Sequence, residues 1–221
     1  MSNLSYMQKA TDRGQLQIHV TTERGFFPIK DASIRLSYTG NPTEIIEELS
    51  TDISGQTAAV ELPAPPLEYS MEPSEFQPYS EYTIQVNASG YRPINISGIS
   101  VLPDKTSIQN VRMETATVEN PLERNIVITA NTLYGNFPPK IPEDEIKPMT
   151  ESGEIVLSRV VVPEYVIVHD GAPSDSSAPN YWVRYKDYIK NVASCEIYST
   201  WPESSIYANI LAIQSLSLIH I

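Results

Sequence analysis

Residues 14–21 read GQLQIHVT, and their apolar and polar side chains alternate with a period of two. Successive side chains of a β-strand point to opposite faces, so this alternation predicts a strand with one buried face. Further short segments of the same kind follow, separated by turn signals such as TDISG at 51–55 and SGY at 89–91. Several short strands with turns between them predict a mainly β protein with an antiparallel β-sandwich over residues 14–113. The side chains expected to be buried in it are Leu16, Ile18, Val20, Ile34, Leu36, Ile84 and Val86.

The composition narrows the class of protein. The chain has 221 residues and a hydrophobic fraction of 41%, which is enough for one large or two ordinary globular domains. Its formal net charge of −12 argues against a nucleic-acid or anionic-membrane surface, because both need clusters of Lys and Arg. No stretch approaches the ~18 apolar residues of a membrane span, and the first residues lack the apolar core of a secretion signal. We therefore expect a protein made in the cytoplasm, with no nucleic-acid partner and no membrane span.

The sequence predicts no cofactor and no metal site. Cys195 is the single cysteine, so an intrachain disulfide and a cysteine-rich metal site are both excluded. His19 falls on the polar side of its predicted strand and is expected at the surface. His169 and Asp170 could form a metal or catalytic pair, but a third ligand is missing. The following glycine favours a turn capped by Asp170 instead.

Changes in composition divide the chain into four parts: a tail at 1–13, the sandwich at 14–118, a connector at 119–152 and a second domain at 153–221. The connector mixes prolines with acidic residues and lacks a sustained period. Within the sandwich region, residues 62–82 are rich in proline and are expected to form an extended crossover packed on the sandwich. In the second domain, residues 154–171 read as two buried strands broken at Pro163, and residues 181–196 turn to helical spacing.

A carboxylate continues the apolar stripe of that predicted helix. Tyr185, Ile189 and Val192 fall at i, i+4 and i+7, and Glu196 follows at i+11. The next helix is predicted to begin with Thr200 and Glu203 as a capping box and Pro202 in its first turn, with Ile206, Ile210 and Ile213 on one face. Glu196 is therefore expected at the junction of two helices.

Such a position permits two roles for Glu196. Partial desolvation would favour the protonated carboxyl, which is the form that a general acid needs in order to protonate a glycosidic oxygen. Alternatively, the carboxylate would accept hydrogen bonds from the backbone N–H groups of the next helix. The spacing alone favours this structural role.

The order of the strands resembles the transthyretin-like or carboxypeptidase-regulatory-like sandwich. The matching positions are Pro28, Ile29, Ala32, Thr51, Asp52, Gly55, Tyr82, Ile84, Val86, Ala88, Gly90 and Tyr91. Gly55 and Gly90 are expected to supply turns with positive φ, and Asp52 can hydrogen-bond the turn backbone. The resemblance implies a scaffold or binding module, and no catalytic residues are apparent in it.

Residues 188–202, YIKNVASCEIYSTWP, resemble the opening motif of the SpoIID/LytB family of peptidoglycan-cleaving proteins. The matching residues are Tyr188, Val192, Glu196, Trp201 and Pro202, followed by Ala208 and Ala212 in the next helix. The resemblance implies that Glu196 is the catalytic acid/base of a lytic transglycosylase and that Tyr188 and Trp201 bind the substrate. Two departures are Asn191, where the family has Gly, and Gln214–Leu216, where it has Arg-Thr-Tyr.

The proline-rich crossover and its flanking strands resemble the amino-terminal pro-region of SleC-type spore cortex-lytic enzymes of clostridia. This implies a sandwich prodomain followed by the start of an α+β SpoIID-like catalytic domain. It also implies peptidoglycan as substrate, an activating protease as partner, and a place in the cortex or coat region of the spore.

The chain stops at SLSLIHI while the last helix is still predicted to continue. We therefore expect a truncated catalytic domain that is inactive alone, and we assign no site to His220. The competing interpretation is a non-enzymatic spore or cell-wall module. In it the sandwich binds peptidoglycan or a partner protein, and Glu196 only caps a helix.

Overall fold

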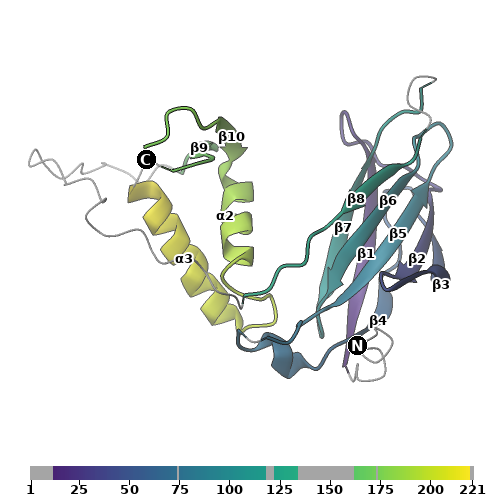
Figure 1. Ribbon diagram of the computed structural model, residues 1–221. Helices are drawn as coiled ribbons and strands as arrows, with labels where there is room; N and C mark the ends of the chain where they lie inside the picture. Colours follow the sequence, from purple (N-terminus) through teal and green to yellow (C-terminus); the bar gives the residue numbers. More distant parts are fainter. Residues whose placement is uncertain (1–11, 74, 118–121, 134–161, 173, 220–221) are drawn as a thin grey trace, which may run out of the picture. The chain divides into compact units, whose positions relative to one another are not determined.

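The computed structural model describes residues 12–73, 75–117, 122–133, 162–172 and 174–219 (Figure 1). The chain forms two compact units. The first comprises Met1–Tyr134 together with Tyr198–Pro202, and the second comprises Gly135–Ile197 and Glu203–Ile221. The short segment Tyr198–Pro202 thus groups with the first unit, although it lies between two helices of the second unit in the sequence.

The first unit contains two β-sheets (Figure 1). One has the strand order β4-β1-β7 and the other has the order β3-β2-β5-β6-β8. The strands are β1 (Asp12–Thr22), β2 (Ser33–Tyr38), β3 (Asn41–Ser50), β4 (Val60–Ala64), β5 (Ser80–Asn87), β6 (Ile94–Val101), β7 (Thr106–Met113) and β8 (Arg124–Val127). A short 3-10 helix, η1 (Leu67–Ser70), lies in the proline-rich crossover.

Both sheets contribute side chains to one hydrophobic core, which confirms the mainly β sandwich. All seven side chains that the sequence placed in this core are fully buried: Leu16, Ile18, Val20, Ile34, Leu36, Ile84 and Val86. The period-two prediction holds because each of these strands has one face against the facing sheet.

The sequence predicted an antiparallel sandwich, but two of its strand pairs are parallel. β1 pairs with β7 in parallel, and β6 pairs with β8 in parallel. β8 lies inside the range 119–152 predicted as connector, and β1 begins at Asp12 inside the predicted tail. Strand β3 escaped prediction because it is an edge strand whose side chains are nearly all exposed, so it has no buried face to set a period. The predicted strand at 154–161 lies outside the described residues.

The turn at 51–56 has the chemistry that the sequence predicted. The Asp52 carboxylate accepts hydrogen bonds from the backbone N–H groups of Ser54 and Gln56 and from the Ser54 hydroxyl. The bonds from Gln56 and Ser54 hold the pKa of Asp52 below its usual value. Gly55 has φ of 75° and Gly90 has φ of 83°, so both adopt the left-handed conformation expected of them.

These two glycines form a matched pair for a stability test. A Cβ at Gly55 would lie 2.5 Å from the Val20 carbonyl oxygen and 3.0 Å from Pro28 Cβ, whereas a Cβ at Gly90 would meet nothing within 4 Å. We expect Gly90→Ala to cost about 1–2 kcal/mol, which is the penalty of the left-handed conformation alone. Gly55→Ala should cost about 3 kcal/mol or more, because the backbone clash adds to it. Urea unfolding of both variants checks this, and equal losses would show that the contacts around Gly55 are not rigid.

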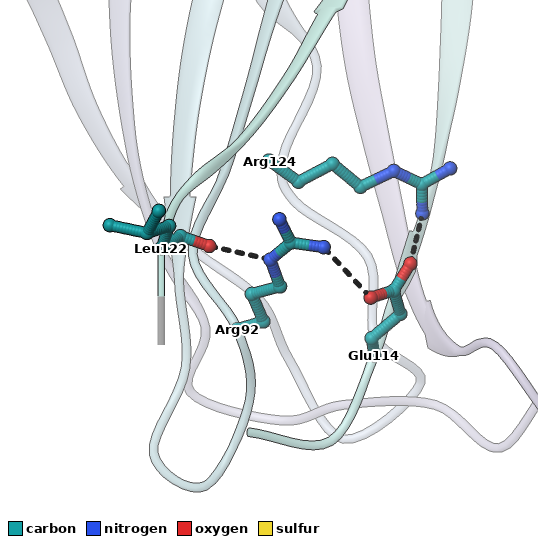
Figure 2. A network of polar contacts seen from close by, with 4 residues as sticks. All are labelled: Arg92, Glu114, Leu122 and Arg124. Atoms are coloured by element: carbon teal, nitrogen blue, oxygen red, sulfur yellow. Dashed lines mark hydrogen bonds and ion pairs between the residues drawn. The ribbon is translucent and has the colours of Figure 1, made fainter. Parts of the chain in front are cut away.

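Glu114 joins three separate parts of the first unit (Figure 2). Its carboxylate lies 3.1 Å from Arg92 Nη1 and 2.9 Å from Arg124 Nη1. Arg92 Nε also donates to the Leu122 carbonyl oxygen. Glu114 follows β7, Arg92 precedes β6 and Arg124 begins β8, so the ion pairs fix the end of β7 and hold β8 at the edge of its sheet. The partial burial of Arg92 and Glu114 shields this network from solvent.

In the part of the second unit that the structure describes, residues 162–172 and 174–219, the chain forms a two-stranded antiparallel ribbon and two helices (Figure 1). They are β9 (Tyr165–His169), β10 (Asn180–Arg184), α2 (Tyr185–Ser194) and α3 (Glu203–Ile219). Val166, Tyr185, Ile189 and Ile213 form the buried core between them. Residues 181–184 were predicted to begin the helix, but they form β10, because Tyr181, Trp182 and Val183 suit a strand and pair with β9.

Within the described residues, no helix is both long and apolar enough to cross a membrane.

Candidate functional site

A cavity of about 410 Å³ lies within the second unit and includes Glu196 in its lining. The lining comes from β9, α2 and α3: Val166, Ile167, Val168, His169, Tyr188, Val192, Glu196, Ile213, Leu216 and Ser217. Most of these side chains are aliphatic, and only a few carry polar groups. This balance is typical of pockets that bind small ligands.

Glu196 lies just beyond the end of α2. The helix ends at Ser194, and the backbone N–H of Glu196 donates to the Ala193 carbonyl oxygen at 3.1 Å. Its Oε2 accepts a hydrogen bond of 2.7 Å from Asn209 Nδ2 on α3. Glu196 therefore lies at the helix junction, as predicted, with one carboxylate oxygen held by a neutral donor.

Two details differ from the expectations for Glu196. The side chain is exposed in the described structure, so the predicted partial desolvation is not observed. Glu196 has left the helix, which removes it from the apolar stripe of Tyr185 and Ile189. The alternative role expected for Glu196 was to accept hydrogen bonds from backbone N–H groups of α3. The observed donor is instead the Asn209 side chain.

Tyr188 lines the same cavity as Glu196. Its ring stacks on that of Tyr185, with centroids 6.4 Å apart and planes 17° apart. Because Tyr185 is buried in the core of the second unit, this contact gives Tyr188 a fixed support. The structure thus brings together two of the three residues proposed for the site.

Trp201 does not line this cavity. It belongs to the segment that groups with the first unit, and its indole Nε1 donates to the Ser70 carbonyl oxygen at 2.7 Å. The Thr200 hydroxyl donates to the same oxygen at 3.3 Å. Thr200 therefore does not cap α3, which begins later, at Glu203. The capping-box prediction is wrong, because the Thr200 hydroxyl bonds to the Ser70 carbonyl oxygen and not to the start of α3.

His169 is a further candidate for the site, although the sequence favoured a turn capped by Asp170 over a metal or catalytic pair here. It lies at the end of β9 and lines the cavity with Glu196. Nδ1 is 3.0 Å from Asn180 Oδ1, and Nε2 is 3.0 Å from the Ala172 carbonyl oxygen. These contacts close the β9–β10 hairpin, so the ring is held in place and both nitrogens are engaged. His169 and Glu196 line the same cavity although they are 27 positions apart in the sequence, so spacing alone could not reveal that they share it.

Cys195 is a free, exposed thiol next to Glu196 in the sequence. The described part of the chain contains no group of three or more His, Cys, Asp and Glu side chains that could hold a metal ion.

No protein-family model matches the chain, and no curated protein matches its sequence. Among solved structures, the Bacillus anthracis TIE protein matches 48% of this chain at 17% identity with a TM-score of 0.33. The minor pilin of Streptococcus agalactiae matches 48% at 13% identity with a TM-score of 0.34. The matches cover 17% and 46% of those two chains, respectively. Klebsiella pneumoniae 5-hydroxyisourate hydrolase matches 47% of this chain at 15% identity, with a TM-score of 0.31 over 92% of its own length. None of these similarities carries a functional argument.

Proposed function

We propose that this chain is part of a spore cortex-lytic enzyme precursor of the SleC type, a lytic transglycosylase that cleaves peptidoglycan during germination. The observation that supports it most is the shared cavity of Glu196 and Tyr188. The residue that the SpoIID/LytB resemblance marks as the acid/base thus lies exposed, at a cavity large enough for part of a sugar.

The hydrogen bonding of Glu196 leaves one carboxylate oxygen for a substrate. Asn209 holds Oε2, while Oε1 has no hydrogen-bond partner among the described residues and is available to a substrate. As the acid, the Glu196 carboxyl gives its proton to the glycosidic oxygen, and the bond from C1 to that oxygen breaks. The 6-hydroxyl of the same sugar then bonds to C1 and returns its proton to the carboxylate. The product is a 1,6-anhydro sugar, and no water is consumed.

The remaining parts have supporting roles in this proposal. The sandwich is the prodomain, an activating protease releases it, and the protein is located in the cortex or coat region of the spore. The site needs no metal or other cofactor for this chemistry.

A second candidate function is a non-enzymatic module that binds cell-wall glycan or a partner protein. It is favoured by one observation, the exposure of the Glu196 side chain, because the partial desolvation expected of a general acid is not observed. In this case the Glu196–Asn209 hydrogen bond would serve only to join the end of α2 to α3.

The products of cortex digestion distinguish the two candidates. The enzyme releases muropeptides with anhydro ends from purified cortex, whereas a binding module sediments with cortex and releases nothing.

A further inference from the structure

A second hollow in the second unit is distinct from the Glu196 cavity. It has a volume of about 620 Å³ and is lined by Val162, Pro163, Glu164, Arg184, Tyr185, Lys186, Ile189, Lys190 and Gln214. None of these residues lines the Glu196 cavity. We call this hollow the basic groove.

The basic groove gathers all the Lys and Arg side chains of its region. Within residues 162–172 and 174–219, which the structure describes, the only ones are Arg184, Lys186 and Lys190, and all three line the groove. Glu164 is the single acidic residue in the lining. The groove is therefore a local positive site in a chain whose formal net charge is −12.

The three cations are available to a ligand. All are exposed, and neither Lys186 nor Lys190 has an ion-pair partner among the described residues. Interaction with the Tyr165 side chain raises the pKa of Arg184, so the guanidinium stays charged and is held beside β9. Lys186 and Lys190 are four residues apart on α2, so they lie on neighbouring turns of one helix face. Together they form a row of positive charge along the groove.

Part of the groove lining, which we call the apolar wall, is aliphatic. Val162, Pro163 and Ile189 contribute aliphatic surface, and the Gln214 amide adds a donor and an acceptor. A ligand that matches the three cations and the apolar wall carries several carboxylates and small aliphatic side chains.

We propose that the basic groove binds a short acidic peptide of the kind that peptidoglycan carries on its glycan strands, with carboxylates on Arg184, Lys186 and Lys190 and alanine methyl groups on the apolar wall. This assignment rests on the proposed function for its ligand and adds a peptide-binding subsite to it. A charged hydrogen bond contributes more than a neutral one, so recognition depends mainly on the three cations.

The test is titration of the 221-residue chain by isothermal calorimetry with three probes: a muropeptide carrying its peptide, the same disaccharide without peptide, and inorganic phosphate. The test variant is Lys186→Gln/Lys190→Gln, and Gln keeps the helix propensity of α2. The control, Lys30→Gln/Lys105→Gln, removes the same charge from the first unit. We expect the test variant to bind the muropeptide about tenfold more weakly or worse, since hydrogen bonds to charged groups contribute about 1.5–3 kcal/mol. The control variant should bind normally.

Three results would overturn the inference: equal affinity in the test variant, equal binding of the peptide-free disaccharide, or phosphate binding as tight as that of the muropeptide. Failure here is distinguishable from failure of the proposed function, because the groove and the Glu196 cavity share no lining residue and because peptide binding and cortex digestion are measured separately. If the full-length protein digests cortex after removal of its proposed prodomain but the groove binds no peptide, only the groove is contradicted. If the groove binds peptide but that full-length protein digests no cortex, only the enzyme is contradicted.

Discussion

Replacement of Glu196 by Gln should leave the protein folded and nearly abolish cortex digestion. Gln keeps the size of the side chain and its contact with Asn209, but it cannot supply a proton. Loss of a general acid typically lowers the rate by about 10²- to 10⁴-fold. The measurement is the rate of muropeptide release from purified spore cortex by the full-length protein after removal of its proposed prodomain, with thermal unfolding recorded for the same preparations.

The matched control for this variant is Glu203→Gln. Glu203 is an exposed carboxylate at the start of α3 that is bonded to the Tyr207 hydroxyl and does not line the cavity. The Glu203→Gln variant carries the same chemical change seven residues away from Glu196, so this variant should digest cortex at the normal rate. The structural role of Glu196 predicts the opposite pattern. Glu196→Gln would then lose about 1 kcal/mol of stability and keep full activity.

Truncation of Ile84 to Ala should strongly destabilise the sandwich. Ile84 is fully buried in β5, which pairs with β2 on one side and β6 on the other. Deletion of buried methyl and methylene groups leaves a cavity, and this change typically costs about 2–5 kcal/mol. The same substitution at Ile108 on β7, where the side chain is 54% exposed, should cost under about 1 kcal/mol. The free energy of unfolding in urea checks both values, and similar losses would contradict the assignment of the core.

The sequence predicted the sandwich well where a strand has one buried face. Leu16, Ile18 and Val20 alternate with polar residues because β1 lies between the core and solvent, and the pattern identified them correctly. The prediction failed for β3 and β8, which lie at the two edges of one sheet. An edge strand buries little, so packing imposes no period on its sequence.

The candidate site was only partly predictable for a similar reason. The helical stripe placed Tyr185 and Ile189 correctly, because the core of the second unit fixes their spacing. Hydrogen bonds between distant residues decided the rest. Asn209 donates to the Glu196 carboxylate, and the Trp201 indole N–H donates to the Ser70 carbonyl oxygen. His169 lines the cavity, and its ring is held by contacts with Asn180 and Ala172. No spacing rule encodes contacts of this kind.

The products formed in ¹⁸O-labelled water test most directly whether the protein cleaves peptidoglycan without adding water, as we propose. Purified cortex is digested in H₂¹⁸O by the full-length protein after removal of its proposed prodomain, and the released muropeptides are analysed by mass spectrometry. We expect 1,6-anhydro ends that carry no ¹⁸O, since the sugar's own 6-hydroxyl closes the ring. Reducing ends that carry one ¹⁸O atom, or no released muropeptides at all, would contradict it.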